Sequence, residues 1–167
     1  METEKKLKLL QMFYAGALAD STLRMHKEGI LEKVTAEKKT EQLANGKLRA
    51  AQLGIQRPVE VFEVLPEVFG CANWRTERTE EGFEATATGC MLCGLAKKLG
   101  AGCPCNIHCL DAMEGLVRGV DENAQYDVIS TLWDQTECKV AIRTGNSGGE
   151  PPPPCNMIPP GSSSCAC

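Results

Sequence analysis

The sequence has few aromatic residues and no excess of positive charge. Phe, Trp and Tyr make up 5% of its 167 residues, so a core has to be built mainly from Leu, Val, Ala, Ile and Met. Lys and Arg number 18 against 22 Asp and Glu, which gives a net charge of −4. Nucleic-acid-binding proteins need clustered basic side chains to neutralise phosphates. We therefore expect no nucleic-acid partner.

A long apolar run is also missing. The patch LLQMFYAGALA near the start contains Gln and Tyr, and it is shorter than the roughly 20 apolar residues that span a bilayer. It does not have the features of a secretory signal. These observations predict a cytoplasmic protein with no membrane partner. In that compartment disulfides are rare, and clustered cysteines are typical of metal sites or catalytic thiols.

The sequence also does not contain several motifs that are diagnostic of a particular catalytic or binding function. The sequence has no phosphate-binding glycine motif, no H-E-x-x-H and no nucleophile elbow. It has only two histidines, His26 and His108. His26 falls at the end of a predicted helix, where the helix dipole explains it. His108 adjoins Cys109 and is the better functional candidate.

The order of patterns predicts an α+β domain. Apolar residues at three- and four-residue spacings indicate helices over 4–28 and 35–53, with Thr35 as the N-cap of the second and Gly46 weakening it. Short segments rich in Thr and aromatics, 69–77 and 83–88, predict one β-hairpin, and 126–144 predicts another. The segment VEVFEVL between them and the helices is ambiguous. We expect N-terminal helices packed on an antiparallel sheet, with a helical cysteine-rich insert between its two hairpins.

Composition changes abruptly after residue 144. The segment 145–167 is rich in Gly, Pro and Ser and cannot bury much apolar surface, so we expect a single domain over 1–144 followed by a tail. Cys155, Cys165 and Cys167 lie in this tail. They are either incidental thiols or residues that reach back to a metal site or exchange disulfides.

Five cysteines within twenty residues form the most informative feature of the chain, and a sixth follows on a predicted strand. Thiolates are strong soft-metal ligands and nucleophiles. We expect at least three of the six to converge on one point, as ligands of zinc or of an iron–sulfur cluster. A catalytic thiol and buried structural cysteines are the alternatives. The six are Cys90, Cys93, Cys103, Cys105, Cys109 and Cys138.

The span from about residue 68 to 142 resembles the L-2-amino-thiazoline-4-carboxylic acid hydrolase family. The resemblance is carried by VFGCANW, TATGCMLC, CPCNIHCLD and STLWDQTECKVAI. It is also similar in pattern to the related 4-vinyl-reductase type of small-molecule-binding domain, which includes zinc-bearing sensors. The resemblance implies a ligand pocket between helices and sheet, with the cysteines beside it.

Two functions follow as hypotheses. The first is a hydrolase that opens a C–N or C–S bond in a small cyclic substrate, with Cys109 as nucleophile or metal ligand, His108 as base and Asp111 as the orienting carboxylate. Arg118 or Arg75 would pair with a substrate carboxylate. The second is a non-enzymatic sensor of a small ligand, a metal or redox state. For partners we expect a small molecule and a second copy of the chain in a homodimer.

Overall fold

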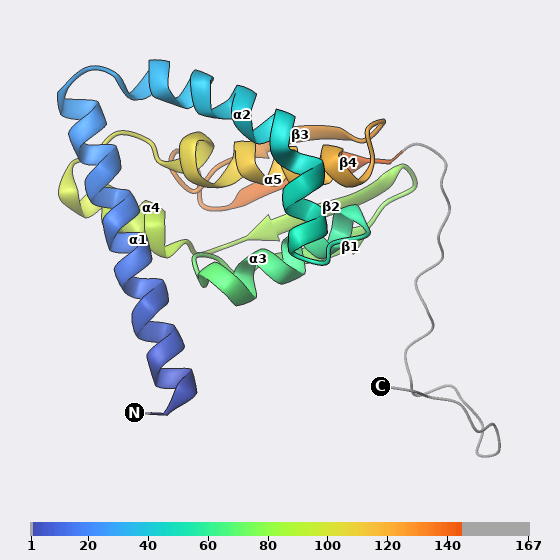
Figure 1. Ribbon diagram of the computed structural model, residues 1–167, viewed down its shortest axis with the longest axis horizontal. Coiled ribbons are helices and arrows are strands. Elements are labelled where there is room, and N and C mark those ends of the chain that lie inside the picture. The colour runs from blue at the N-terminus through green and yellow to red at the C-terminus, as the bar shows by residue number, and fades with distance from the viewer. Residues whose placement is uncertain (1, 145–167) are drawn as a thin grey trace.

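The computed structural model describes residues 2–144 and has the predicted α+β fold (Figure 1). The segment 145–167, with its three cysteines, lies outside the described residues. In chain order the elements are α1 Thr3–Lys27, α2 Leu31–Gln52, the 3-10 turn η1 Pro58–Glu60, α3 Val61–Phe69, β1 Arg75–Arg78, β2 Gly82–Ala87, α4 Met91–Leu99, the π-helical turn η2 Asn106–Leu110, α5 Asp111–Val120, β3 Gln125–Ser130 and β4 Cys138–Arg143.

The two predicted hairpins join into one antiparallel sheet with the strand order β1-β2-β4-β3. Strands β2 and β4 pair at the centre, where Phe83 lies opposite Ile142. Their side chains alternate between buried and half-buried, as expected when one face of a sheet covers the core. The outer strand β1 is fully exposed and carries charged side chains, which discourage pairing with another sheet.

The first hairpin begins later than predicted. Phe69 does not start a strand, because it ends α3, and Gly70 closes that helix with a φ of 62°. The ambiguous segment before it is therefore helical, with Pro66 inside α3. Its two exposed glutamates, Glu63 and Glu67, have a helical four-residue spacing, but the segment is short and Pro66 argued against a helix.

Helix α2 packs across α5, which lies between α2 and the sheet (Figure 1). This close packing explains why a glycine, Gly46, stands inside the helix. A Cβ at this position would overlap the backbone carbonyl of Gly115 on α5. The helix begins at Leu31 rather than at Thr35. The Thr35 hydroxyl donates a hydrogen bond to the carbonyl of Leu31 (2.7 Å), so Thr35 lies inside the first turns and is no cap.

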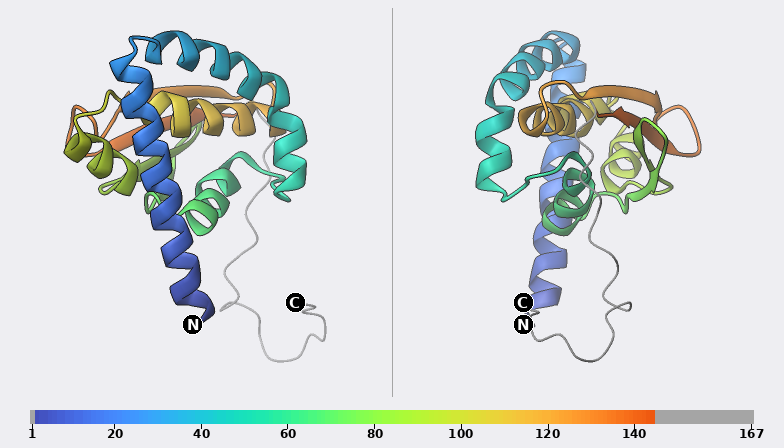
Figure 2. Two further views of the ribbon diagram at one scale, coloured as in Figure 1. Left: turned by 60° about the vertical axis from the view of Figure 1, so that its left-hand side comes forward. Right: turned by 90° about the vertical axis from the view of Figure 1, so that its right-hand side faces the viewer.

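Helix α1 packs on α4, and its N-terminal part extends past the body of the fold (Figure 2). Ala15 and Ala19 are its buried apolar residues. Near its middle it also meets α3, where Tyr14 stacks on Phe69 with ring centroids 5.4 Å apart. None of the helices described for residues 2–144 is both long and apolar enough to cross a membrane.

Candidate ligand pocket and thiol group

A cavity of about 510 Å³ lies between helices α1, α2, α3 and α5 and the start of α4. Most of its wall is apolar, with Leu18, Leu65, Phe69, Trp74 and Met113 among the lining residues. Cavities of this size commonly hold small-molecule ligands. The pocket thus lies among the helices, with no residue of the described strands in its lining, and not between helices and sheet as the resemblance implies.

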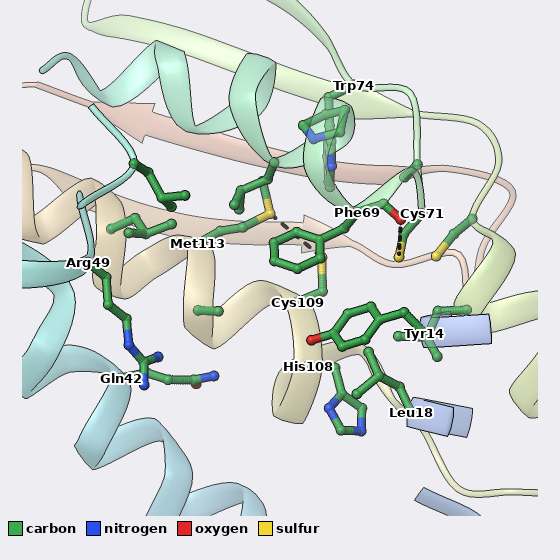
Figure 3. Close-up of a pocket in the computed structure, with 18 of the residues that line it drawn as sticks. Tyr14, Leu18, Gln42, Arg49, Phe69, Cys71, Trp74, His108, Cys109 and Met113 are labelled. Atoms are coloured by element: carbon green, nitrogen blue, oxygen red, sulfur yellow. Dashed lines mark hydrogen bonds between the residues drawn. The ribbon is translucent and has the colours of Figure 1, made fainter. Parts of the chain in front are cut away.

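One wall of the pocket is polar and comes mainly from α2. Lys38, Gln42 and Arg49 line it, and Figure 3 shows Gln42 and Arg49 across the cavity from Tyr14 and Leu18. Gln42 is only 4% exposed, and its Oε1 has no hydrogen-bond partner among the described residues. Orphaned buried polar atoms are rare in proteins and cost about 1–3 kcal/mol. A residue of this wall therefore carries a buried polar atom that no other described residue satisfies.

Two positively charged side chains, Lys38 and Arg49, line the same wall of the pocket as the Gln42 amide. Neither Lys38 nor Arg49 forms an ion pair with a carboxylate of residues 2–144. Burial lowers the pKa of Lys38, and the neighbouring charge of Arg49 lowers it further. An anion bound between them would relieve both effects.

Sequence reasoning missed these three residues. Their spacing of four and then seven puts them on one face of α2, which is a usable signal. A polar stripe on a helix, however, normally indicates the solvent side. Only the position of α2 over the pocket reveals that the stripe faces inward.

His108 lines the same pocket, and both of its ring nitrogens are engaged. Nε2 lies 3.0 Å from the hydroxyl of Thr22, which donates onward to the carbonyl of Leu18, and Nδ1 lies 3.4 Å from the Lys38 ammonium. These contacts assign a neutral ring that donates through Nε2–H and accepts at Nδ1. Burial and the charge of Lys38 lower the pKa of His108 to about 4. A base at Nδ1 would first have to lose its contact with Lys38.

Cys109 also lines the pocket, but no contact joins it to His108. Its thiol donates to the sulfur of Met113 at 3.6 Å (Figure 3). Burial, reinforced by Cys138, raises the pKa of the Cys109 thiol. The protonated thiol is a weak nucleophile until a base or a ligand changes its surroundings.

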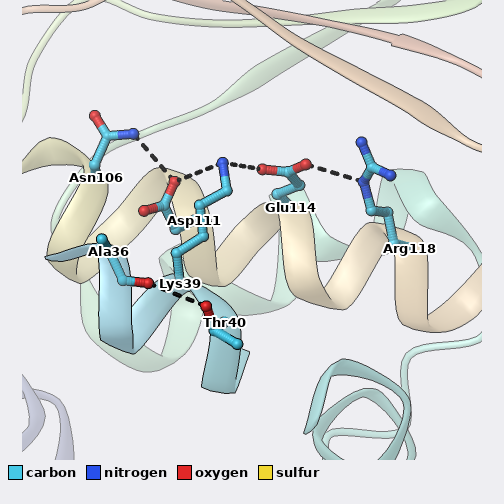
Figure 4. A network of polar contacts seen from close by, with 7 residues as sticks. All are labelled: Ala36, Lys39, Thr40, Asn106, Asp111, Glu114 and Arg118. Atoms are coloured by element: carbon cyan, nitrogen blue, oxygen red, sulfur yellow. Dashed lines mark hydrogen bonds and ion pairs between the residues drawn. The ribbon is translucent and has the colours of Figure 1, made fainter. Parts of the chain in front are cut away.

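Asp111 lies in a separate polar network between α2 and α5 (Figure 4). It is 2% exposed, accepts a hydrogen bond from Asn106 (3.0 Å) and lies 3.4 Å from the Lys39 ammonium. Glu114 binds the same ammonium at 2.8 Å and holds Arg118 at 2.9 Å. The predicted orienting role of Asp111 is therefore not realised, since its carboxylate is committed to Lys39 and Asn106.

The predicted substrate arginines lie elsewhere too. Arg118 is held by Glu114, and Arg75 is exposed on the edge strand β1. Neither lines the cavity. The positively charged residues that line it are Lys38 and Arg49.

The cysteines of the predicted metal site form pairs. The sulfur atoms of Cys93 and Cys105 lie 3.4 Å apart, and the sulfur of Cys90 accepts the backbone N–H of Cys93 at 3.5 Å. A second cavity of about 20 Å³ is lined by Cys90, Cys93, Cys105, Cys109 and Cys138. Hydrogen bonds from the thiols of Cys105 and Cys90 lower the pKa of Cys93. A hydrogen bond with Cys105 likewise lowers the pKa of Cys103, to about 7.

The expected convergence of three ligands is not found. Within residues 2–144 no group of three or more His, Cys, Asp or Glu side chains is arranged to hold a metal ion. Cys105 precedes the π-helical turn η2 and Cys109 lies within it, and the two sulfurs have different neighbours. Cys105 turns to Cys93, whereas Cys109 turns to Met113.

Comparisons with models of known protein families, with curated proteins and with solved structures found no match for this chain.

Proposed function

We propose that this chain is a small-ligand-binding domain whose pocket takes an amphipathic anion. The ligand would have an apolar body and a carboxylate or a head group of similar size and charge. The single observation that carries the proposal is the polar wall of the pocket. There Gln42, whose amide oxygen is buried without a partner among the described residues, lies between two cations without carboxylate partners in the wall of an otherwise apolar cavity.

The chemistry of this wall fits an anionic head group in two ways. Arg49 presents a guanidinium, which binds a carboxylate through two parallel hydrogen bonds. Gln42 supplies an amide that can donate to the second oxygen once its side chain turns over, since the two ends of an amide differ only in which hydrogen bonds they make. The apolar body would lie against Trp74, Phe69 and Leu65.

Isothermal titration calorimetry with decanoate and with decanol tests this proposal, because the two probes share an apolar tail and differ in charge. We expect decanoate to bind in the pocket and decanol to bind more weakly. Arg49→Met should weaken decanoate binding at least about tenfold, because it removes two charge-assisted hydrogen bonds, and leave decanol unchanged. Lys47→Met is the matched control, since Lys47 is exposed on the same helix outside the pocket. Equal binding of both probes to all variants would refute the anion site.

A thiazoline ring-opening hydrolase is the second candidate. It is favoured by the position of Cys109 and His108, which follow each other on η2 and both line the cavity. The ligand carboxylate would bind at Arg49 and Lys38, and Cys109 would have to lose its proton before attack. Purified protein incubated with a thiazoline carboxylate tests it. Turnover that Cys109→Ser abolishes would support the hydrolase, and the absence of turnover would leave the binding function alone.

We retain zinc or an iron–sulfur cluster, a cytoplasmic location and a homodimer as further proposals. The location is supported by the seven described cysteines, all of which are free thiols. The homodimer is supported by apolar side chains on α1, where Leu10 is 59% and Phe13 69% exposed. Two copies could bury the same face of α1 against each other. Light scattering of the wild-type chain and of Phe13→Glu tests the dimer, which the charged residue should dissociate.

A further inference from the structure

Cys93 and Cys105 form a buried pair of thiols that the proposed ligand binding does not use. Their sulfur atoms lie 3.4 Å apart, and each residue is 6% exposed. A disulfide needs a sulfur–sulfur distance of about 2.05 Å, so the two atoms have to approach by only about 1.4 Å. Cys93 sits in the first turn of α4, and Cys105 immediately precedes η2. Neither is fixed in a strand, so small side-chain rotations can close this distance.

The surroundings of the pair favour reaction at Cys93. Cys90 is the N-cap of the nine-residue helix α4, and its sulfur accepts the backbone N–H of Cys93. Cysteine sulfur at the start of a helix lies at the positive end of the helix dipole, where reactive thiolates are found. The sulfur of Cys105, 3.4 Å away, is a partner that could resolve an oxidised Cys93.

A small oxidant can reach this pair from the ligand pocket. The cavity of about 20 Å³ beside the two sulfurs has room for about one water-sized molecule. Trp74, Cys90 and Cys109 line both this cavity and the large pocket, so the two spaces adjoin. The size excludes a bulky disulfide such as oxidised glutathione and restricts an oxidant to a molecule as small as hydrogen peroxide, which would approach the sulfurs from the adjoining large pocket.

We propose that Cys93 and Cys105 are a modification site, a dithiol that hydrogen peroxide converts reversibly to a disulfide. The Cys93 sulfur, as thiolate, attacks one peroxide oxygen. The O–O bond breaks, Cys93 becomes a sulfenic acid, and the released hydroxide takes a proton to form water. The Cys105 sulfur then attacks the Cys93 sulfur and the S–O bond breaks. The leaving hydroxide takes the Cys105 proton, so a second water is released. Together the thiols lose two electrons, which reduce one peroxide to two waters.

Mass spectrometry of the full chain after brief peroxide treatment tests the proposal. Trypsin cuts at Lys97 and Lys98, between the two cysteines, so the disulfide joins peptides 79–97 and 99–118. Each peptide carries other cysteines, and fragmentation spectra identify the linked pair in the wild-type protein without any variant. We expect one linkage, Cys93 to Cys105, that dithiothreitol reverses.

Cysteine variants give a second, independent test of which two sulfurs form the disulfide. Cys93→Ser and Cys105→Ser should each abolish the linkage, whereas Cys71→Ser should keep it, since Cys71 lines the pocket but contacts a backbone carbonyl instead of this pair. Three results would overturn the proposal. These are a disulfide between another pair, irreversible sulfinic acid at Cys93 with no linkage, and stoichiometric zinc or iron that protects both thiols until it is removed. Because decanoate binding is measured without oxidant, failure of this site and failure of the ligand site are distinguishable.

Discussion

The Gln42 side chain lowers the stability of the fold, and we propose that it contributes to ligand binding. Its amide oxygen is buried without a partner among the described residues, so the folded chain carries a cost that an apolar residue of similar size would not. Strained or unsatisfied groups of this kind concentrate at functional sites. The neighbouring charges of Lys38 and Arg49 give the amide a use only when an anion is present.

Replacing this residue should therefore act in opposite directions on stability and on binding. We expect Gln42→Leu to leave the free energy of unfolding unchanged or to raise it by about 1 kcal/mol, and to weaken decanoate binding severalfold. Urea unfolding and calorimetry measure the two quantities. Gln135→Leu is the control, because Gln135 is exposed in the loop between β3 and β4 and should affect neither. Loss of stability in Gln42→Leu with unchanged affinity would make the amide a purely structural group.

His108 should make the stability of the fold depend on pH. Its pKa is about 4 in the folded chain and about 6.5 when unperturbed, so the unfolded chain binds more protons between these values. The contribution of the neutral ring is present above about pH 6.5 and is lost as the pH falls toward 4. We expect His108→Gln to be less stable than the wild-type chain at pH 7, with a difference that shrinks by pH 4.5. Urea unfolding at both pH values checks this, and a constant difference would contradict the assignment of a neutral ring.

At the level of elements, the crossing of α2 over α5 decides where the pocket wall lies. The two backbones approach so closely that a Cβ at Gly46 would overlap the carbonyl of Gly115, and one at Gly119 would overlap the backbone of Gly46. The buried residues Gln42, Gly46 and Ala50 follow one another at four-residue spacing on this face of α2. The close approach of the two helices at Gly46 therefore determines how near the pocket Gln42, one turn away, is placed.

Substitution of this glycine should separate the two helices. We expect Gly46→Ala to lower the free energy of unfolding by about 2 kcal/mol or more, because overpacking against backbone outweighs the gain in helix propensity. Gly16→Ala on α1 is the matched control. Nothing lies within 4 Å of a Cβ there, so the propensity gain of about 0.5–1 kcal/mol should appear alone. Thermal or urea unfolding compares them, and equal effects of the two changes would show that the helices can move apart freely.

The elements themselves were largely predictable, for local reasons. Short segments rich in Thr and aromatics identified both hairpins, and three- and four-residue spacings identified α1 and α2. Helices α4 and α5 fall in the predicted helical, cysteine-rich insert. The starts of α2 and β1 were wrong, because Thr35 and Phe69 have local propensities that their surroundings override. The π-helical turn η2 had no signal in the sequence.

At the scale of the whole molecule, only some of the residues that line the candidate pocket could be predicted from the sequence. His108 and Cys109 were identified because histidines are rare and cysteines cluster, and both line the pocket. Sequence reasoning missed Lys38, Gln42 and Arg49. A polar stripe on a helix can face either solvent or a pocket, and only the packing of the helix decides which. Conversely, Asp111 looked functional from its place after Cys109. The packing of α2 on α5 turns it toward Lys39 instead.

The described residues 2–144 contain every contact on which the proposed ligand site and thiol pair depend. The pocket is built from residues between Tyr14 and Leu116, and the cavity beside the sulfurs closes at Cys138. A chain truncated after Thr144 should accordingly keep the melting temperature, the decanoate affinity and the Cys93–Cys105 linkage of the full chain. Elemental analysis of both chains adds a second readout. Zinc or iron present in the full chain and lost on truncation would make tail cysteines metal ligands, because residues 2–144 alone provide no group of three. Truncation that lowers the melting temperature or weakens decanoate binding would contradict the assignment of a complete domain to residues 1–144.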